Sequence, residues 1–151
     1  MNENTKLFLS FSDDDFTDPL QFELYNYWLK VKGDRAMPAR RDIHVHELKH
    51  MLPTLMMLDF NVVEKSIMFR LIGTECTNIY GEHTGKVMNL YPEHKEAVKR
   101  LMWCVENKKP YYVIKNLGNI NKEYVNTSFI ILPLADDGEN VNKILVGHHF
   151  Y

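Results

Sequence analysis

Apolar residues recur at helical spacing in two long segments of the chain. In residues 19–32, Asp18 is a candidate N-cap, Pro19 takes the first helical position, and Gly33 follows as a terminator. In residues 92–107, a proline begins a segment whose apolar positions form a single stripe. Both segments are therefore predicted to be helices. Two shorter helices are expected, one between Asp42 and Pro53 and one between Thr74 and Gly81.

Five further segments have the length and apolar content of β-strands. They cover residues 54–62, 67–73, 111–117, 124–134 and 143–151. Polar turn residues separate neighbouring segments, as at Asp136-Asp137-Gly138, and favour antiparallel pairing. The strands form two groups around the helices instead of alternating with them. This order predicts an α+β fold with a five-stranded antiparallel sheet, a helical block on one face, and a small apolar cavity between the two.

The helix at residues 19–32 carries more apolar side chains than packing on one small core requires. One stripe includes Leu24 and Trp28, and a second consists of Phe22, Tyr25 and Leu29. Either the helix packs deeply into the protein, or the second stripe forms a contact between two copies of the chain. Phe22, Tyr25 and Leu29 are therefore candidates for a homodimer interface.

The chain is expected to hold one domain. Residues 18–151 form it, with residues 18–33 as a flanking helix and residues 53–151 as the core. Residues 1–17 mix polar residues and three consecutive aspartates with isolated apolar residues, and are interpreted as a loosely held arm. Whether apolar side chains of this arm cover part of the sheet is left open.

Composition restricts the class of partner. The 151 residues are 45% hydrophobic and 25% charged, which suits one globular domain. A formal net charge of −2 gives no general attraction to nucleic acid or to an anionic membrane, and the longest apolar run is too short to span a bilayer. Two cysteines make no disulfide framework. We therefore expect a cytoplasmic protein that binds neither nucleic acid nor membrane.

Six short segments follow one another in a recognisable order. They are Tyr27-Trp28; Met37-Pro38-Ala39-Arg40 with Asp42-Ile43; Leu52-Pro53; Arg70-Leu71-Ile72-Gly73-Thr74; Gly81-Glu82-His83-Thr84-Gly85; and Leu132-Pro133-Leu134 with Asp137-Gly138. Together they resemble the PAS sensory domain, in particular a bacterial group of short single-domain PAS-like regulatory proteins. The resemblance covers about residues 20–151 and leaves out the arm.

The resemblance implies a signal-sensing, regulatory domain without catalysis of its own. Such a domain binds a small ligand or a partner protein and is commonly a homodimer through a flanking helix. Because the chain carries no recognisable output domain, its signal is expected to pass through a separate signalling protein.

Five aromatic residues lie in segments expected to border the cavity. Stacking on aromatic rings, with a few polar groups, is how a small planar ligand is held, although aromatic residues at such spacings more often belong to an ordinary core. The candidate pocket residues are Tyr80, Tyr91, Trp103, Tyr112 and Phe129.

The cofactor is left unknown, with haem and flavin as the two considered. Some PAS domains hold haem through a histidine, and His83 and His94 are the best-placed candidates here. The sequence that surrounds the reactive cysteine of flavin photosensors is missing at both Cys76 and Cys104. A light-driven cysteine adduct is therefore not expected.

The segment His46-Glu47-Leu48-Lys49-His50 has the H-E-x-x-H pattern of zinc hydrolases. In such enzymes the two histidines bind the metal from one face of a helix and the glutamate activates water. Pro53 would end this helix three residues after His50, and no third ligand follows at a suitable spacing. Solvent-facing histidines are the simpler interpretation. A small enzyme, or a zinc hydrolase with His46 and His50 as ligands, is the alternative function.

Overall fold

The computed structural model describes residues 5–151, which form a six-stranded antiparallel sheet with helices on both faces. The strands are β1 (Thr5–Phe8), β2 (Leu55–Asn61), β3 (Ser66–Ile72), β4 (Tyr111–Leu117), β5 (Lys122–Leu134) and β6 (Lys143–Phe150). Their order across the sheet is β1-β4-β5-β6-β2-β3. The predicted α+β class is confirmed.

Three α-helices and six short 3₁₀ helices connect the strands. The α-helices are α1 (Pro19–Lys32), α2 (Thr74–Tyr80) and α3 (Lys95–Asn107). The 3₁₀ helices are η1 (Asp13–Asp15), η2 (Arg40–Asp42), η3 (Val45–Thr54), η4 (Met88–Leu90), η5 (Pro92–His94) and η6 (Gly118–Ile120). None of these helices has the length and apolar composition that crossing a membrane would need.

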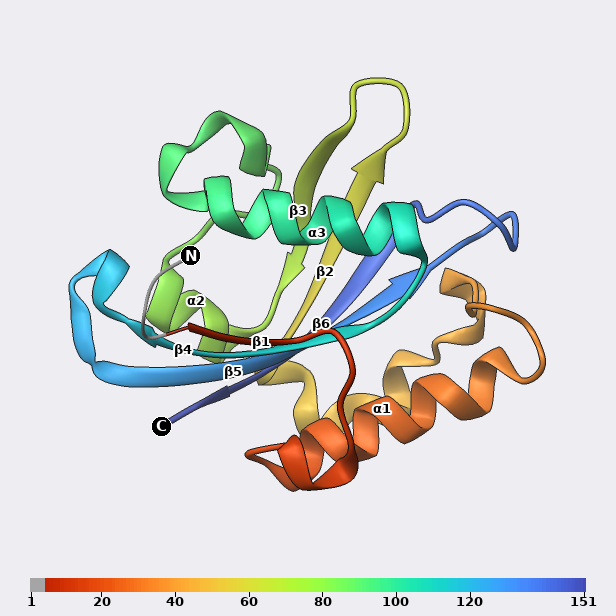
Figure 1. Cartoon of the computed structure of the whole chain (residues 1–151), viewed down its shortest axis with the longest axis horizontal. Helices are drawn as coiled ribbons and strands as arrows, with labels where there is room; N and C mark the ends of the chain where they lie inside the picture. The colour runs from red at the N-terminus through yellow and green to blue at the C-terminus, as the bar shows by residue number, and fades with distance from the viewer. Residues whose placement is uncertain (1–4) are drawn as a thin grey trace.

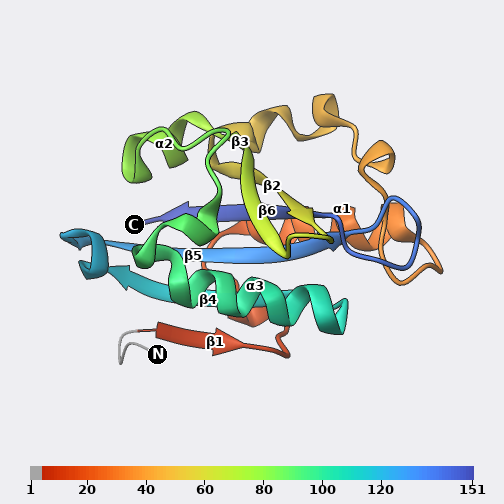
Figure 2. The same ribbon diagram turned by 90° about the horizontal axis from the view of Figure 1, so that it is seen from above.

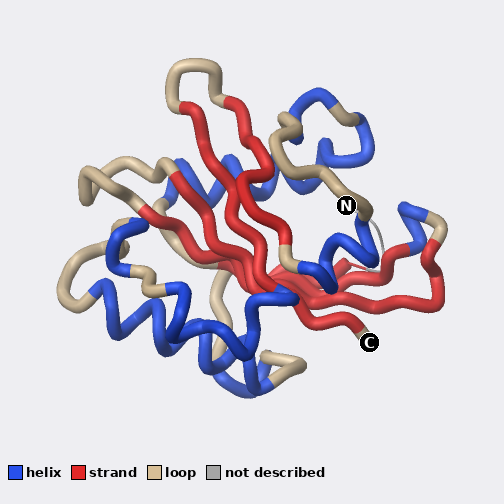
Figure 3. The backbone as a smooth tube through the Cα atoms, turned by 180° about the vertical axis from the view of Figure 1, so that it is seen from behind, coloured by secondary structure: helices blue, strands red, loops and turns tan. Residues whose placement is uncertain are grey.

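The helices divide between the two faces of the sheet. Helix α3 lies across one face, and α1 lies against the other (Figure 1). Seen from above, α3 runs over β4 and β5 (Figure 2). Seen from behind, the strands form one continuous twisted layer, with the β2–β3 hairpin turned away from the other strands (Figure 3). The core therefore has two parts, one under α1 and one under α2, η4 and α3.

The sixth strand comes from the N-terminal arm, where no strand was predicted. Thr5–Phe8 pairs antiparallel with β4, so that Leu7 lies opposite Val113 and Phe8 opposite Tyr112. Without β1, the edge of β4 would present a row of unpaired backbone groups. A four-residue strand carries too little periodicity to be found from sequence. The arm, from residue 5 onward, thus covers apolar surface at the sheet edge.

Helix α1 has the predicted bounds and packs tightly on the sheet. The carboxylate of Asp18 accepts a hydrogen bond from the backbone N–H of Leu20 at 2.7 Å, which caps the first turn. The indole N–H of Trp28 donates to the carbonyl of Pro133 at 3.0 Å. Gly147 on β6 allows the close approach, because a Cβ at that position would lie 2.6 Å from Cδ2 of Leu24.

Two predicted helices take a different form. The helix expected between residues 42 and 53 is the 3₁₀ helix η3, which contains Pro53. Proline lacks the N–H of an α-helical hydrogen bond and its ring clashes with the preceding turn, so regular α-helix is disfavoured there. The helix expected at residues 92–107 begins with the separate turn η5, and α-helix runs only from Lys95 to Asn107.

Candidate functional site

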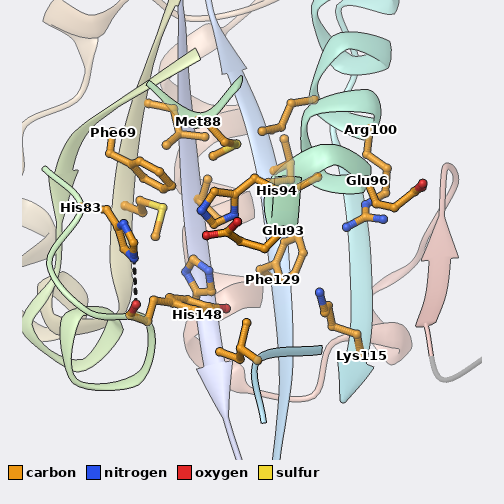
Figure 4. Close-up of a pocket in the computed structure, with 18 of the residues that line it drawn as sticks. Phe69, His83, Met88, Glu93, His94, Glu96, Arg100, Lys115, Phe129 and His148 are labelled. Atoms are coloured by element: carbon orange, nitrogen blue, oxygen red, sulfur yellow. Dashed lines mark hydrogen bonds between the residues drawn. The ribbon is translucent and has the colours of Figure 1, made fainter. Parts of the chain in front are cut away.

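A cavity of about 280 Å³ lies between the inner face of the sheet and the helices that cover it (Figure 4). Strands β2 to β6 form its floor, and η4, η5 and α3 form its roof. Most of the lining is apolar, and includes Met56, Leu58, Phe69, Met88, Phe129 and Val146. A cavity of this volume suits a small ligand.

Strand β4 contributes a charged residue to this apolar space. Because side chains alternate along a strand, Tyr111, Lys115 and Leu117 face the cavity, whereas Tyr112 lies on the face toward α1. Lys115 is half-buried. Burial lowers the pKa of its ammonium group, and the nearby charge of Arg100 lowers it further.

Helix α3 contributes a second cation. Ala97, Arg100 and Leu101 project from one side of the helix toward the cavity, together with Glu96 and with Glu93 of the preceding turn. Nε of Arg100 is buried and has no hydrogen-bond partner. Within residues 5–151, no carboxylate forms an ion pair with Arg100 or Lys115. Two neighbouring cations therefore face the same space without a direct ion pair, although Glu93 and Glu96 border it too.

Two imidazoles at the cavity wall also have buried atoms without partners. Nε2 of His83 lies 2.8 Å from the carbonyl oxygen of Tyr80, so Nε2 carries a proton, and in the neutral ring Nδ1 is an acceptor. Nδ1 of His83 and Nε2 of His94 are both buried and unpartnered, and the two rings are 5.8 Å apart. Burial lowers the pKa of His94, helped by His83 and Lys115 and opposed by Glu93. His94 is therefore neutral at pH 7.

A third histidine, His148, lies in the floor of the cavity and is 7% exposed. Burial lowers its pKa to about 4, so the ring is neutral at physiological pH. Its Nδ1 is 3.5 Å from Sγ of Cys76. Neighbouring His149 lies on the other face, where its Nδ1 is 2.8 Å from Oγ1 of Thr17. The two neighbouring histidines therefore lie on opposite faces of the sheet.

The comparison with protein families decides the identity of the fold. A family model described as PAS domain matches residues 17–147. The chain belongs to the PAS domain family. The resemblance drawn from six short segments of the sequence is thereby confirmed, and the molecule is a signal-sensing domain by family.

Comparisons with curated proteins and with solved structures add less about this domain than the family model does. No curated protein matches this PAS domain. Among solved structures, that of an RNA-binding light-oxygen-voltage receptor is similar, with a TM-score of 0.46 and 8% sequence identity. The match covers 96% of this chain and 38% of that chain, so the PAS domain spans under two fifths of the receptor's length.

The structure brings two of the five predicted pocket aromatics to the cavity. Tyr80 and Phe129 line it. Tyr91 lies behind the imidazoles, with its ring 6.4 Å from that of His83 and 6.0 Å from that of His94. The other two lie elsewhere: Trp103 packs on Tyr111 at 6.1 Å, and Tyr112 faces α1. A ligand contact at any of the five stays a prediction.

Sequence reasoning did not select Arg100 and Lys115. Both interrupt an apolar pattern at a position that faces inward: Lys115 shares the face of Tyr111 in β4, and Arg100 follows Ala97 at helical spacing. A charged residue at an inward position was the signal available. It could not be used without knowing which face of each element is covered.

The H-E-x-x-H segment lies on the surface. His46 and His50 are exposed and belong to the 3₁₀ helix η3. With three residues per turn, side chains four apart do not stack on one face as they do in an α-helix. Nε2 of His50 is instead 2.7 Å from a carboxylate oxygen of Glu23 on α1. Within residues 5–151, no group of three or more metal-ligating side chains comes together.

The candidate interface residues on α1 have different surroundings. Phe22 and Leu29 are exposed. Tyr25 is half-buried, because the arm places Phe11 and Phe16 against it at ring distances of 5.1 and 6.0 Å. The exposed part of the second stripe is therefore smaller than the sequence indicates, and a homodimer contact there stays a prediction.

The cavity is small for haem or flavin. Its volume of about 280 Å³ lies just below the range of roughly 300–1,000 Å³ found for pockets that hold drug-sized ligands, and both cofactors are large. His83 also presents Nδ1 to the cavity, since its Nε2 is held by the Tyr80 carbonyl. We therefore derive no function through either group.

Proposed function

We propose that this PAS domain binds a small molecule in the cavity under α3 and transmits the bound state to a separate signalling protein, without catalysing a reaction itself. The observation that carries the proposal is the set of buried polar atoms in an apolar cavity. Leaving such an atom without a hydrogen bond costs about 1–3 kcal/mol. Nδ1 of His83 and Nε2 of His94 both have this cost, which a bound ligand with suitable polar groups would remove.

The strands of the cavity floor offer a route for the signal. On β5, Phe129 lines the cavity while the carbonyl of adjacent Ser128 accepts a hydrogen bond from Gln21 of α1 at 3.1 Å. On β6, His148 lines the cavity while the carbonyl of adjacent Gly147 accepts from the same amide at 3.2 Å. A ligand that shifts either strand therefore displaces a hydrogen-bond partner of α1.

The ionisation of the cysteines supports a role without nucleophilic catalysis. Burial raises the pKa of Cys76 and that of Cys104 to about 12, so both remain neutral thiols at pH 7. Two free, buried thiols also favour a reducing compartment such as the bacterial cytoplasm. The net charge of −2 gives no support to nucleic acid as a partner.

The output surface in this proposal is α1. Phe22 and Leu29 are exposed beside the helix residues that bond to the sheet, and they are suited to contact a second copy of the domain or the signalling protein. A homodimer through this helix is the arrangement we propose.

Native mass spectrometry of the purified protein tests ligand binding, together with thermal shifts against a library of small metabolites. A molecule that binds only the folded state must raise the melting temperature. Ala97→Phe would fill part of the cavity and should abolish both the bound mass and the shift, whereas Lys99→Phe, on the exposed side of α3, should preserve them. Absence of any bound mass and of any shift in the unmodified protein would contradict the proposal.

A further inference from the structure

The cavity carries two cations on one side and the imidazole of His83 on the other, with Glu93 and His94 between them (Figure 4). Arg100 and Lys115 lie on the side of α3 and β4, and His83 lies on the side of β3. Phe69, Met88 and Phe129 occupy the space around these groups. A ligand that satisfies this lining has one charged end and an apolar body.

The cations favour a negative charge at that end. Arg100 and Lys115 are both half-buried, and within residues 5–151 neither has an ion-pair partner, so each would be stabilised by an anion that excludes water from it. Burial and the charge of Arg100 lower the pKa of Lys115, which reflects the same unfavourable juxtaposition. An anion between the two would relieve the repulsion and supply an acceptor to the buried Nε of Arg100.

The rest of the site favours a carboxylate over a phosphate ester. Phosphate carries nearly two negative charges and is usually held by several cations or by backbone N–H groups. Here Glu93 and Glu96 border the cavity beside α3 and would repel a second negative charge. Both glutamates are exposed, so water weakens this repulsion, and a single charge meets about half the repulsion that a double charge meets.

The opposite end of the site carries the imidazole of His83. Nδ1 of His83 is an acceptor, because its Nε2 donates to the Tyr80 carbonyl. A hydroxyl or amine on the ligand can donate to it, and the neutral ring of His94 lies beside it at 5.8 Å. The apolar body between the two ends is short, because the whole cavity measures about 280 Å³.

We propose that the cavity binds a small monocarboxylic acid, with the carboxylate held by Arg100 and Lys115 and a hydrogen-bond donor on the other end directed to His83. This inference rests on the proposed sensory function and names the chemical class of its ligand.

Isothermal titration and thermal shifts on the full chain test the proposal. The probes are benzoate, 4-hydroxybenzoate, hexanoate and 6-hydroxyhexanoate, each compared with its primary amide. We expect at least one acid to bind at least tenfold more tightly than its amide, and the hydroxylated acid of a pair to bind more tightly than the plain one. Losing a hydrogen bond to a charged group costs about 1.5–3 kcal/mol, so Arg100→Gln and Lys115→Gln should each weaken binding by about 10- to 150-fold.

Three further variants make the test specific. Lys99→Gln removes a cation from the neighbouring, exposed position of α3 and should leave the affinity unchanged. Glu96→Gln removes a nearby negative charge and should tighten binding of the acid. His83→Phe should remove the advantage of the hydroxylated acid and leave that of the carboxylate. Circular dichroism and urea unfolding establish that each variant is folded.

The outcomes separate this inference from the proposed function. Amides that bind as tightly as their acids, or full affinity in folded Arg100→Gln, would overturn the carboxylate assignment while leaving a ligand-binding cavity in place. A molecule that co-purifies with the domain is extracted and identified: an organic acid supports the inference, and a neutral compound overturns it. If none of the acids or amides binds but another molecule from the library does, only the inference fails; if no molecule binds or co-purifies, the proposed function fails as well.

Discussion

Gln21 is the central polar contact between α1 and the sheet, and replacing it should destabilise the domain. The residue is 2% exposed and uses its full hydrogen-bonding capacity. Its amide N–H groups donate to the carbonyls of Ser128 and Gly147 at 3.1 and 3.2 Å. Its carbonyl accepts from the hydroxyl of Tyr112 at 2.6 Å and from that of Ser128 at 3.2 Å. Gln21→Met keeps the approximate shape of the side chain and removes all four bonds.

The expected cost follows from the net value of a buried hydrogen bond. Each bond contributes about 0.5–1.5 kcal/mol, and the two hydroxyls keep Thr17 as an alternative partner. The free energy of unfolding should therefore fall by about 2–4 kcal/mol, which corresponds to a decrease in Tm of roughly 5–12 °C for a domain of this size. Urea unfolding followed by circular dichroism measures the change.

Two controls show whether the loss of stability comes from the hydrogen bonds of Gln21. Lys30→Met, on the exposed side of the same helix, should change stability by less than about 0.5 kcal/mol. Combining Gln21→Met with Tyr112→Phe should cost less than the sum of the single variants, because both remove the same 2.6 Å bond. A Gln21→Met protein as stable as the unmodified one, or full additivity of the pair, would refute the reasoning.

Three further predictions concern other parts of the domain. Gly147→Ala places a Cβ 2.6 Å from Leu24 and should destabilise the domain by about 1–3 kcal/mol in urea unfolding; unchanged stability would show that α1 can move aside at no cost. Burial lowers the pKa of His148 to about 4 from its ordinary value of 6.5, so the folded state loses stability as the pH falls from about 6.5 toward 4. Between pH 7 and 4.5 this loss is about 2.5 kcal/mol, and it should disappear from the pH dependence of a His148→Leu protein; equal slopes in the two proteins would assign the loss to other groups. Phe22→Glu combined with Leu29→Glu charges the exposed part of α1 and should give a folded monomer in light scattering, whereas an unchanged dimer mass would place any self-contact on another surface.

Patterns that act over a few residues were predicted well. Helix α1 has the expected bounds because its Asp18 cap, its proline and Gly33 act on neighbouring backbone groups. Strands β2 to β6 were located by runs of apolar residues that are long enough to stand out. Prediction failed where the local signal is short or mixed. Strand β1 was not predicted because it has only four residues. Segment η3 was predicted as a helix from its pattern of apolar and polar residues, but it contains Pro53 and is a 3₁₀ helix.

The candidate site was predicted only in part, because adjacent residues on a strand face opposite sides. Tyr111 and Tyr112 are equivalent in the sequence, yet the first lines the cavity and the second bonds to α1. Spacing alone cannot decide between the two faces. For the same reason, the sequence did not show that Lys115 lies on the inner face of β4 together with Tyr111.

The sequence by itself determined the class of fold, the main helices and strands, and the PAS family, since these depend on local propensity and on the order of short segments. The tertiary structure alone decided which side chains meet. The residues that line the cavity range from Thr5 to His148 along the chain. The two cations come from separate elements, Arg100 from helix α3 and Lys115 from strand β4. Their convergence is set by strand pairing and by the packing of α3 on the sheet, which join residues far apart in the chain and leave no local trace in it.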